Sequence, residues 1–171
     1  MTELFEDEKV VEPIDDVEIF EGDEDFAEEY DMDPGKIKLL AKKISDKCGE
    51  YKRKAIDYLK GDDLEDFLLR VDEKFTAIPK VGTHLAWIPK FALLVRSYAM
   101  KEYREISLAG IVAIMTSLVY FAAKIDVIPD ILPGLGFIDD AIVIASVLQW
   151  CEEDLSKYMD WLQEKRESQG K

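Results

Sequence analysis

The first strong hydrophobic pattern along the chain runs from residue 34 to residue 60. Apolar residues recur there at steps of three and four, which is the spacing of one buried face on an amphipathic helix. Asp33 fits the cap of this helix and Pro34 its first position, since proline needs no hydrogen-bond acceptor there. Gly61 fits its end. The pattern predicts a helix over residues 34–60.

Two further amphipathic segments follow. Leu64 to Ile78 carry a second apolar stripe, with Asp62 or Asp63 as its cap, and a third helix is predicted from about Pro89 to Tyr103. No segment alternates between apolar and polar residues with the period of two that a half-buried strand requires.

The most apolar segment is residues 106–123, which contain no charged side chain. Two interpretations stay open for it. A helix that spans a membrane needs roughly 20 apolar residues, and this run is at the lower limit of that length. A helix that is apolar on all sides is also what the centre of a small bundle requires. The second apolar segment, residues 141–151, begins a last helix that narrows to a single apolar stripe further on.

These patterns predict an all-α fold of about five helices, packed as a small bundle around a central apolar helical hairpin. Three parts are expected along the chain: a disordered acidic tail over residues 1–33, an amphipathic helical region over residues 34–103, and the hairpin with the C-terminal helix over residues 104–168.

The charge of the chain is concentrated in the tail. The net charge is −15, and residues 1–33 hold sixteen acidic residues and one base, so the rest of the chain is neutral. Dense like charge with few apolar residues is typical of a disordered segment. The scattered apolar residues between the acids leave a second interpretation open, in which the tail docks on a partner surface.

The outer face of the predicted helix 34–60 is basic. Its candidate anion-binding or tail-docking residues are Lys42, Lys43, Lys47, Lys52, Arg53 and Lys54. Three interpretations remain: a solvated face, a docking surface for the acidic tail of the same chain, or a site for an external anion. As an external partner, an anionic membrane surface is favoured over nucleic acid, and an unknown protein partner is the remaining alternative.

Residues 124–140 form a turn between the two apolar segments. Two prolines and two glycines predict that this turn breaks the helix and folds a hairpin; they are Pro129, Pro133, Gly134 and Gly136. Four aspartates accompany them: Asp126, Asp130, Asp139 and Asp140. Asp139 is placed to cap the last helix, with Asp140 in its first turn.

If the four carboxylates converge, they would repel one another unless protonated or bridged by a hard cation such as Mg²⁺ or Ca²⁺. Helix caps, a cation site and a catalytic carboxylate pair are the three interpretations of this turn. No other cofactor is indicated. His84, the sole histidine, is predicted to be structural, because no catalytic partner stands near it in the sequence.

The run from Tyr120 to Asp140, YFAAKIDVIPDILPGLGFIDD, resembles the signature of the YkvA-like family, a domain of unknown function. The resemblance covers about residues 106–150, and Lys124 stands where the family commonly has proline. It implies a short helical hairpin module of bacterial and archaeal proteins, found also within a membrane-bound RING-type ubiquitin ligase. It implies frequent membrane association and no established catalytic activity.

The resulting expectation is a non-enzymatic interaction or regulatory module with an acidic arm that masks a basic helix face, with membrane association left open. The alternative is a metal-dependent enzyme or cation-binding protein that uses the aspartate-rich turn. The start of the chain lacks a basic and an apolar signal region, which predicts a cytoplasmic location. Cys48 and Cys151 fit a reducing compartment.

Overall fold

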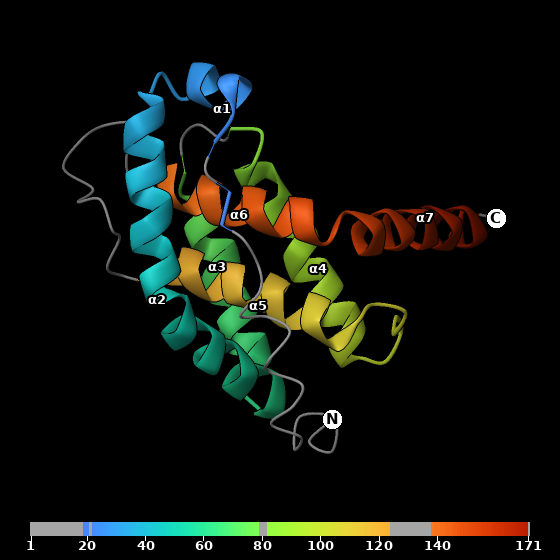
Figure 1. The fold of residues 1–171 in the computed structure, drawn as a ribbon. Coiled ribbons are helices and arrows are strands. Elements are labelled where there is room, and N and C mark those ends of the chain that lie inside the picture. Colours follow the sequence, from blue (N-terminus) through green and yellow to red (C-terminus); the bar gives the residue numbers. More distant parts are fainter. Residues whose placement is uncertain (1–18, 21, 79–81, 124–137, 171) are drawn as a thin grey trace.

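The computed structural model describes residues 19–20, 22–78, 82–123 and 138–170. Within these ranges the fold contains seven α-helices, one 3₁₀ turn and no strand, which confirms the all-α prediction (Figure 1). The expectation of about five helices is too low. The two additional ones are α1, which lies in the predicted tail, and α7, which is separated from α6 where a single last helix was expected.

The helix α2 spans Pro34–Lys60, as the sequence pattern predicts. It begins where Asp33 Oδ1 accepts hydrogen bonds from the backbone N–H groups of Gly35 (2.8 Å) and Lys36 (3.3 Å). Because the apolar positions lie on one side of the helix, Ile37, Ile44, Ala55 and Leu59 are completely buried.

The helices α3 (Leu64–Thr76) and α4 (Ile88–Ala99) are joined through the short 3₁₀ turn η4 (Leu85–Trp87). The predicted end of the third helix at Tyr103 is too late, because Lys101 adopts a positive φ of 61° beyond Ala99. Asp63 occupies the cap position of α3, but its side chain makes no capping hydrogen bond.

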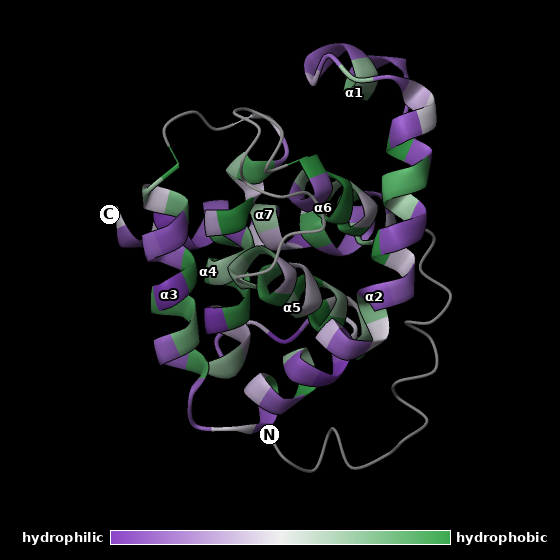
Figure 2. Cartoon of the chain, turned by 90° about the vertical axis from the view of Figure 1, so that its left-hand side faces the viewer, coloured by the Kyte–Doolittle hydropathy of each residue, from purple (hydrophilic) through white to green (hydrophobic). Residues whose placement is uncertain are grey.

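The helix α5 (Leu108–Ala122) is the centre of the bundle and packs against α2, α3, α4 and α6. Figure 2 shows its apolar surface among the helices that carry the polar faces outward. Ser107 caps it by accepting a 3.0 Å hydrogen bond from the Gly110 N–H. The charge-free segment 106–123 therefore supplies core, and among the described residues no helix has both the length and the apolar character needed to cross a membrane.

The helices α6 (Ile138–Trp150) and α7 (Glu152–Gln169) replace the single last helix that was expected. They separate at Cys151, and α7 then starts with Glu152, Glu153 and Asp154, whose negative charges favour a helix N-terminus. In Figure 1, α6 lies against the bundle and α7 extends away from it on the side opposite α2.

The short helix α1 (Glu24–Glu29) lies within the tail that was predicted to be disordered, so this part of the prediction is wrong. Asp23 caps it by accepting a 2.8 Å hydrogen bond from the Phe26 N–H, and the Phe26 side chain is only 2 % exposed. Gly22 precedes the helix with a positive φ of 88° and packs closely against Ile37. A Cβ added at Gly22 would lie only 2.7 Å from Cγ2 of Ile37. The boundary predicted at residue 33 is thus too late. Residues 1–18 lie outside the described residues, so disorder there stays a prediction.

Candidate functional site

Two buried aspartates stand at the start of α6. Asp139 and Asp140 are 0 % and 1 % exposed, although aspartate is rarely buried to this extent. Both lie within the first turn of α6, which begins at Ile138. Asp139 is therefore inside the helix and does not occupy the cap position predicted for it. The positive end of the helix dipole favours both carboxylates at this place.

Asp139 is bonded to the end of α5. The Tyr120 hydroxyl donates a 3.1 Å hydrogen bond to Asp139 Oδ2, and the ring of Tyr51 from α2 meets the Tyr120 ring edge to face with centroids 5.0 Å apart. Burial raises the pKa of Tyr120 far above its ordinary value, and the charges of Asp139 and Asp140 raise it further. Tyr120 is therefore a protonated donor. The corner joins α5 to α6 through this hydrogen bond and α2 to α5 through the aromatic contact.

The C-terminal end of α5 is held by a lysine from α3. Lys74 Nζ donates to the backbone carbonyl of Phe121 and, at 3.4 Å, to that of Ala123, and its ammonium lies 4.9 Å from the Phe121 ring centroid. A cation at this position satisfies carbonyls that have no partner within the helix and complements the helix dipole. The end of α5 is thus held by a side chain from α3, and the start of α6 is held by Tyr120 of α5.

Most of the residues predicted for the turn lie outside the described residues. These are Asp126, Asp130, Pro129, Pro133, Gly134 and Gly136. The structure brings Asp139 and Asp140 together and gives no test of whether the other two carboxylates join them. In the described part of the chain, no group of three or more histidine, cysteine, aspartate or glutamate side chains is placed to hold a metal ion. The cation site stays a hypothesis.

A cavity of about 160 Å³ lies between α2, α5 and α6, one helical turn away from Tyr120 and Asp139 along α5 and α6. Apolar side chains form much of its wall, among them Ala113 of α5 and Val143 of α6. Its polar wall comes from all three helices: Ser45, Cys48 and Lys52 of α2, Thr116 and Ser117 of α5, and Ser146 of α6.

Lys52 was predicted on the exposed basic face, and this prediction is wrong. Its side chain is 8 % exposed and lines the cavity, whereas the other five basic residues, Lys42, Lys43, Lys47, Arg53 and Lys54, are exposed. At roughly 100° per residue, the five occupy one arc of α2 and Lys52 falls at the edge of the core stripe. Lys54 also pairs with Glu50 at 3.2 Å. Whether the exposed face binds an anion or the tail stays a prediction.

The N-terminal segment contributes to the wall of this cavity. Ile19 forms part of the cavity wall, and the Phe20 N–H donates a 2.8 Å hydrogen bond to Ser146 Oγ on α6. On the α2 side, Ile19 and Phe20 line an open hollow together with Lys38 and Lys42. This segment therefore connects α6 to one edge of the basic face.

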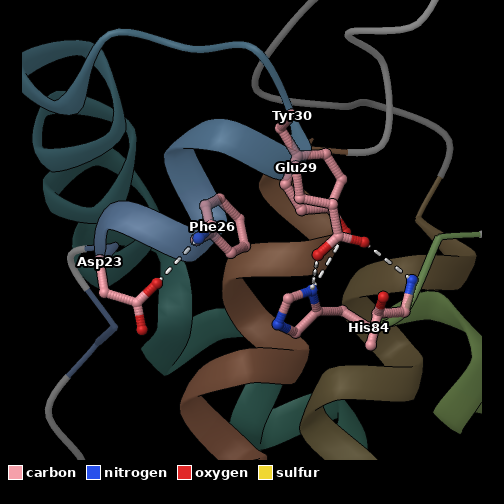
Figure 3. A network of polar contacts seen from close by, with 6 residues as sticks. Asp23, Phe26, Glu29, Tyr30 and His84 are labelled. Carbon is pink, nitrogen blue, oxygen red and sulfur yellow. Dashed lines mark hydrogen bonds and ion pairs between the residues drawn. The ribbon is translucent and has the colours of Figure 1, made fainter.

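Further along the chain, α1 and Tyr30 contact the residues around His84, and these contacts also hold the N-terminal segment in place (Figure 3). Glu29 Oε1 accepts a 3.1 Å hydrogen bond from the Thr83 N–H, and the Tyr30 hydroxyl is 3.1 Å from His84 Nδ1. The Phe26 ring packs against the imidazole at a centroid distance of 5.1 Å. Burial lowers the pKa of His84, while Glu29 and Asp23 oppose this. His84 is thus a structural residue whose partners come from the tail.

Sequence reasoning missed several residues of this site, notably Tyr120, Tyr51, Lys74 and Ser146. A polar side chain at a core-facing position of an apolar helix was the available signal for Tyr120 and Ser146, because burial requires such a group to find a partner. For Lys74 no such signal exists, since its acceptors are backbone carbonyls on another helix.

The fold and these contacts define an all-α bundle built around a short apolar hairpin with a buried acidic corner. The family model "Protein of unknown function (DUF1232)" matches residues 111–145, which include most of α5 and the first part of α6. The "Uncharacterized membrane protein YkvA" of Bacillus subtilis (strain 168) is 30 % identical over 74 residues, which cover 43 % of this chain and 70 % of that protein. The chain belongs to this YkvA-like family of unknown function. No solved structure matches it.

Proposed function

We propose that the protein is a non-enzymatic, membrane-associated interaction module of the cytoplasm, in which the acidic N-terminal arm, residues 1–33, covers one edge of the basic face of α2. The observation that carries this proposal is the position of Ile19 and Phe20. They lie between Ser146 of α6 and the lysines Lys38 and Lys42 of α2.

Electrostatics favours such a covering arm. The arm carries −15, and Lys38 and Lys42 of α2 line the same hollow as Ile19 and Phe20 of the arm. Attraction between them acts over about 10 Å at roughly 0.1 M salt and weakens as salt increases. The apolar contacts of Phe26 and Ile19 fix the path of the arm, so that its acidic residues stay near α2.

An anionic membrane surface is the partner that fits the uncovered face. Exposed lysines and arginines on one helix face gain about 1 kcal/mol each near an anionic leaflet. The relative from Bacillus subtilis is described as a membrane protein, which supports this choice of partner. Binding by charge requires no membrane-spanning helix.

Sedimentation with lipid vesicles tests the proposal on the full chain. A variant with Glu12, Asp15, Asp16 and Glu18 changed to the corresponding amides keeps the anchored residues 19–33 and reduces the negative charge of the arm by four. With vesicles of phosphatidylcholine and phosphatidylserine, the variant should bind more strongly than the unmodified chain. Vesicles of phosphatidylcholine alone should bind neither.

A matched control removes the same charge elsewhere. Glu152, Asp160, Glu164 and Glu167 are exposed on α7, and their change to amides leaves the arm intact. If both variants gain vesicle binding equally, the effect is one of net charge and the masking arm is excluded. If neither gains binding, the membrane partner is excluded.

A second function, divalent cation binding at the acidic corner, is favoured by one observation. Asp139 and Asp140 are neighbouring buried carboxylates, which are the ligand type that Mg²⁺ and Ca²⁺ prefer. Calorimetric titration of the full chain with Mg²⁺, Ca²⁺ and Mn²⁺ tests it. Heat of binding that disappears in Asp140→Asn would support a cation-dependent role, and absence of heat with all three ions would remove it.

A further inference from the structure

The cavity between α2, α5 and α6 has the shape and chemistry of a ligand site. Its volume of about 160 Å³ is close to that of a cavity of about 150 Å³ that holds a single benzene ring in another protein. It is too small for the drug-sized ligands that occupy sites of roughly 300–1,000 Å³. A body of about six carbon atoms is therefore the size that it accommodates.

The hydroxyl groups that α5 and α6 contribute to the cavity wall donate hydrogen bonds to backbone carbonyls of their own helices. Thr116 Oγ1 donates to the Val112 carbonyl at 2.7 Å, Ser117 Oγ donates to the Ile114 carbonyl at 2.6 Å, and Ser146 Oγ donates to the Ile142 carbonyl at 2.8 Å. Because their protons are used in this way, these three side chains offer a ligand only acceptor lone pairs.

Hydrogen-bond donors come from α2. Lys52 carries three N–H donors and a positive charge on a side chain that is 8 % exposed, and Ser45 adds a hydroxyl at the rim. Lys52 also has an interaction within the chain, so a ligand would share its ammonium group. A cation beside an apolar wall selects an anion with a compact apolar body.

We propose that this cavity binds a small monocarboxylate with an apolar body of about six carbons, with its carboxylate at Lys52 and its body against Ala113 and Val143. The site is distinct from the exposed face of α2, because Lys52 points into the bundle and the five other basic residues do not. Its binding does not require that the membrane proposal be correct.

Cys48 provides a local reporter for this site. Its free thiol lines the cavity and is half-buried, whereas Cys151 is 2 % exposed and lies outside the cavity wall. Burial raises the pKa of Cys48, with opposition from Lys52, so alkylation is best measured near about pH 8.5, where more thiolate is present. A ligand in the cavity slows alkylation of Cys48 and leaves that of Cys151 unchanged.

The experiment compares benzoate with benzyl alcohol, a neutral molecule of nearly the same shape, on the full chain at constant ionic strength. Alkylation of each cysteine is followed by mass spectrometry. Benzoate should protect Cys48 with a Kd on the order of 1 mM, a value suited to a ligand of this size. Benzyl alcohol should require at least about tenfold higher concentration, because it lacks the charge that Lys52 pairs with.

Three variants locate the effect. Lys52→Met, which keeps the length of the side chain, should abolish the preference for benzoate over benzyl alcohol, whereas Lys47→Met on the exposed face should retain it. Ala113→Leu should fill the cavity and remove protection by both probes. Failure of benzoate to protect Cys48 in the unmodified chain, or an unchanged preference in Lys52→Met, would overturn the proposal.

Discussion

The Tyr120 hydroxyl donates a 3.1 Å hydrogen bond to Asp139 Oδ2, and this bond joins the last turn of α5 to the first turn of α6. The two residues stand on either side of residues 124–137, which carry most of the family signature. Both are buried, so the bond forms in a surrounding of low polarity, where an unpaired carboxylate would be costly. It therefore fixes the spacing between the end of α5 and the start of α6.

Removal of this donor should destabilise the fold. Tyr120→Phe deletes the hydroxyl and retains the ring contact with Tyr51, so the expected loss is about 1–3 kcal/mol in the free energy of unfolding. Urea denaturation followed by circular dichroism measures it.

Tyr103 offers a matched control, because its hydroxyl is buried and has no hydrogen-bond partner among the described residues. Tyr103→Phe should change the free energy of unfolding by no more than about 0.5 kcal/mol, or increase it. Equal losses in the free energy of unfolding in the two variants would show that the Tyr120–Asp139 hydrogen bond stabilises the fold no more than the Tyr103 hydroxyl does.

Lys74 should stabilise the C-terminal end of α5. Its ammonium donates hydrogen bonds to the backbone carbonyls of Phe121 and Ala123. Lys74→Met should therefore lower the free energy of unfolding by about 0.5–2 kcal/mol. Lys60→Met, at an exposed position at the end of α2, serves as the control. A loss confined to Lys74→Met supports the contact, and hydrogen exchange at the end of α5 should accelerate in that variant only.

The attachment of α1 should weaken in acid. Burial lowers the pKa of His84 below its ordinary value, so the folded state favours the neutral imidazole, which can accept a hydrogen bond from Tyr30. The unfolded chain takes up the proton first as the pH falls below about 6.5. The contribution of His84 to stability is therefore present above that pH and is lost as the pH falls through the lowered pKa.

Urea denaturation of the unmodified chain and of His84→Gln between about pH 7.5 and 5 checks this dependence. The free energy of unfolding of the unmodified chain should fall more steeply toward acid than that of the variant. The groups that face the imidazole are Glu29, Asp23 and Tyr30. A steeper fall in the variant would mean that the ion pair between Glu29 and protonated His84, 3.9 Å apart, dominates.

The sequence predicts α2 well because its signals are local. Asp33, Pro34 and Gly61 lie at the ends of the helix as predicted, and the apolar stripe is the buried face. The prediction fails for Lys52, since a lysine was assigned to the basic face by its charge, whereas its angular position places it beside the core stripe.

The helix α1 could not be predicted in the same way. Its six residues are mostly acidic, and such a helix is too short to be stable by itself. Its stability comes from Phe26 in the core and from the Tyr30–His84 contact, whose partners are 54 residues apart in the chain. The candidate site shows the same limit. The pattern identified Asp139 and Asp140, but the hydrogen bond of Asp139 to Tyr120 depends on how α5 and α6 pack.

If residues 19–20 of the arm cover the α2–α6 region in the folded protein, they should slow the alkylation of Cys48, which lines the cavity there. Ile19→Asp removes an apolar side chain from the wall of the cavity, and Leu39→Asp introduces the same charge at a position that is 55 % exposed on α2. Alkylation of Cys48 should accelerate several-fold in Ile19→Asp and stay unchanged in Leu39→Asp. Equal rates in the unmodified chain and in Ile19→Asp would show that residues 19–20 do not cover this region.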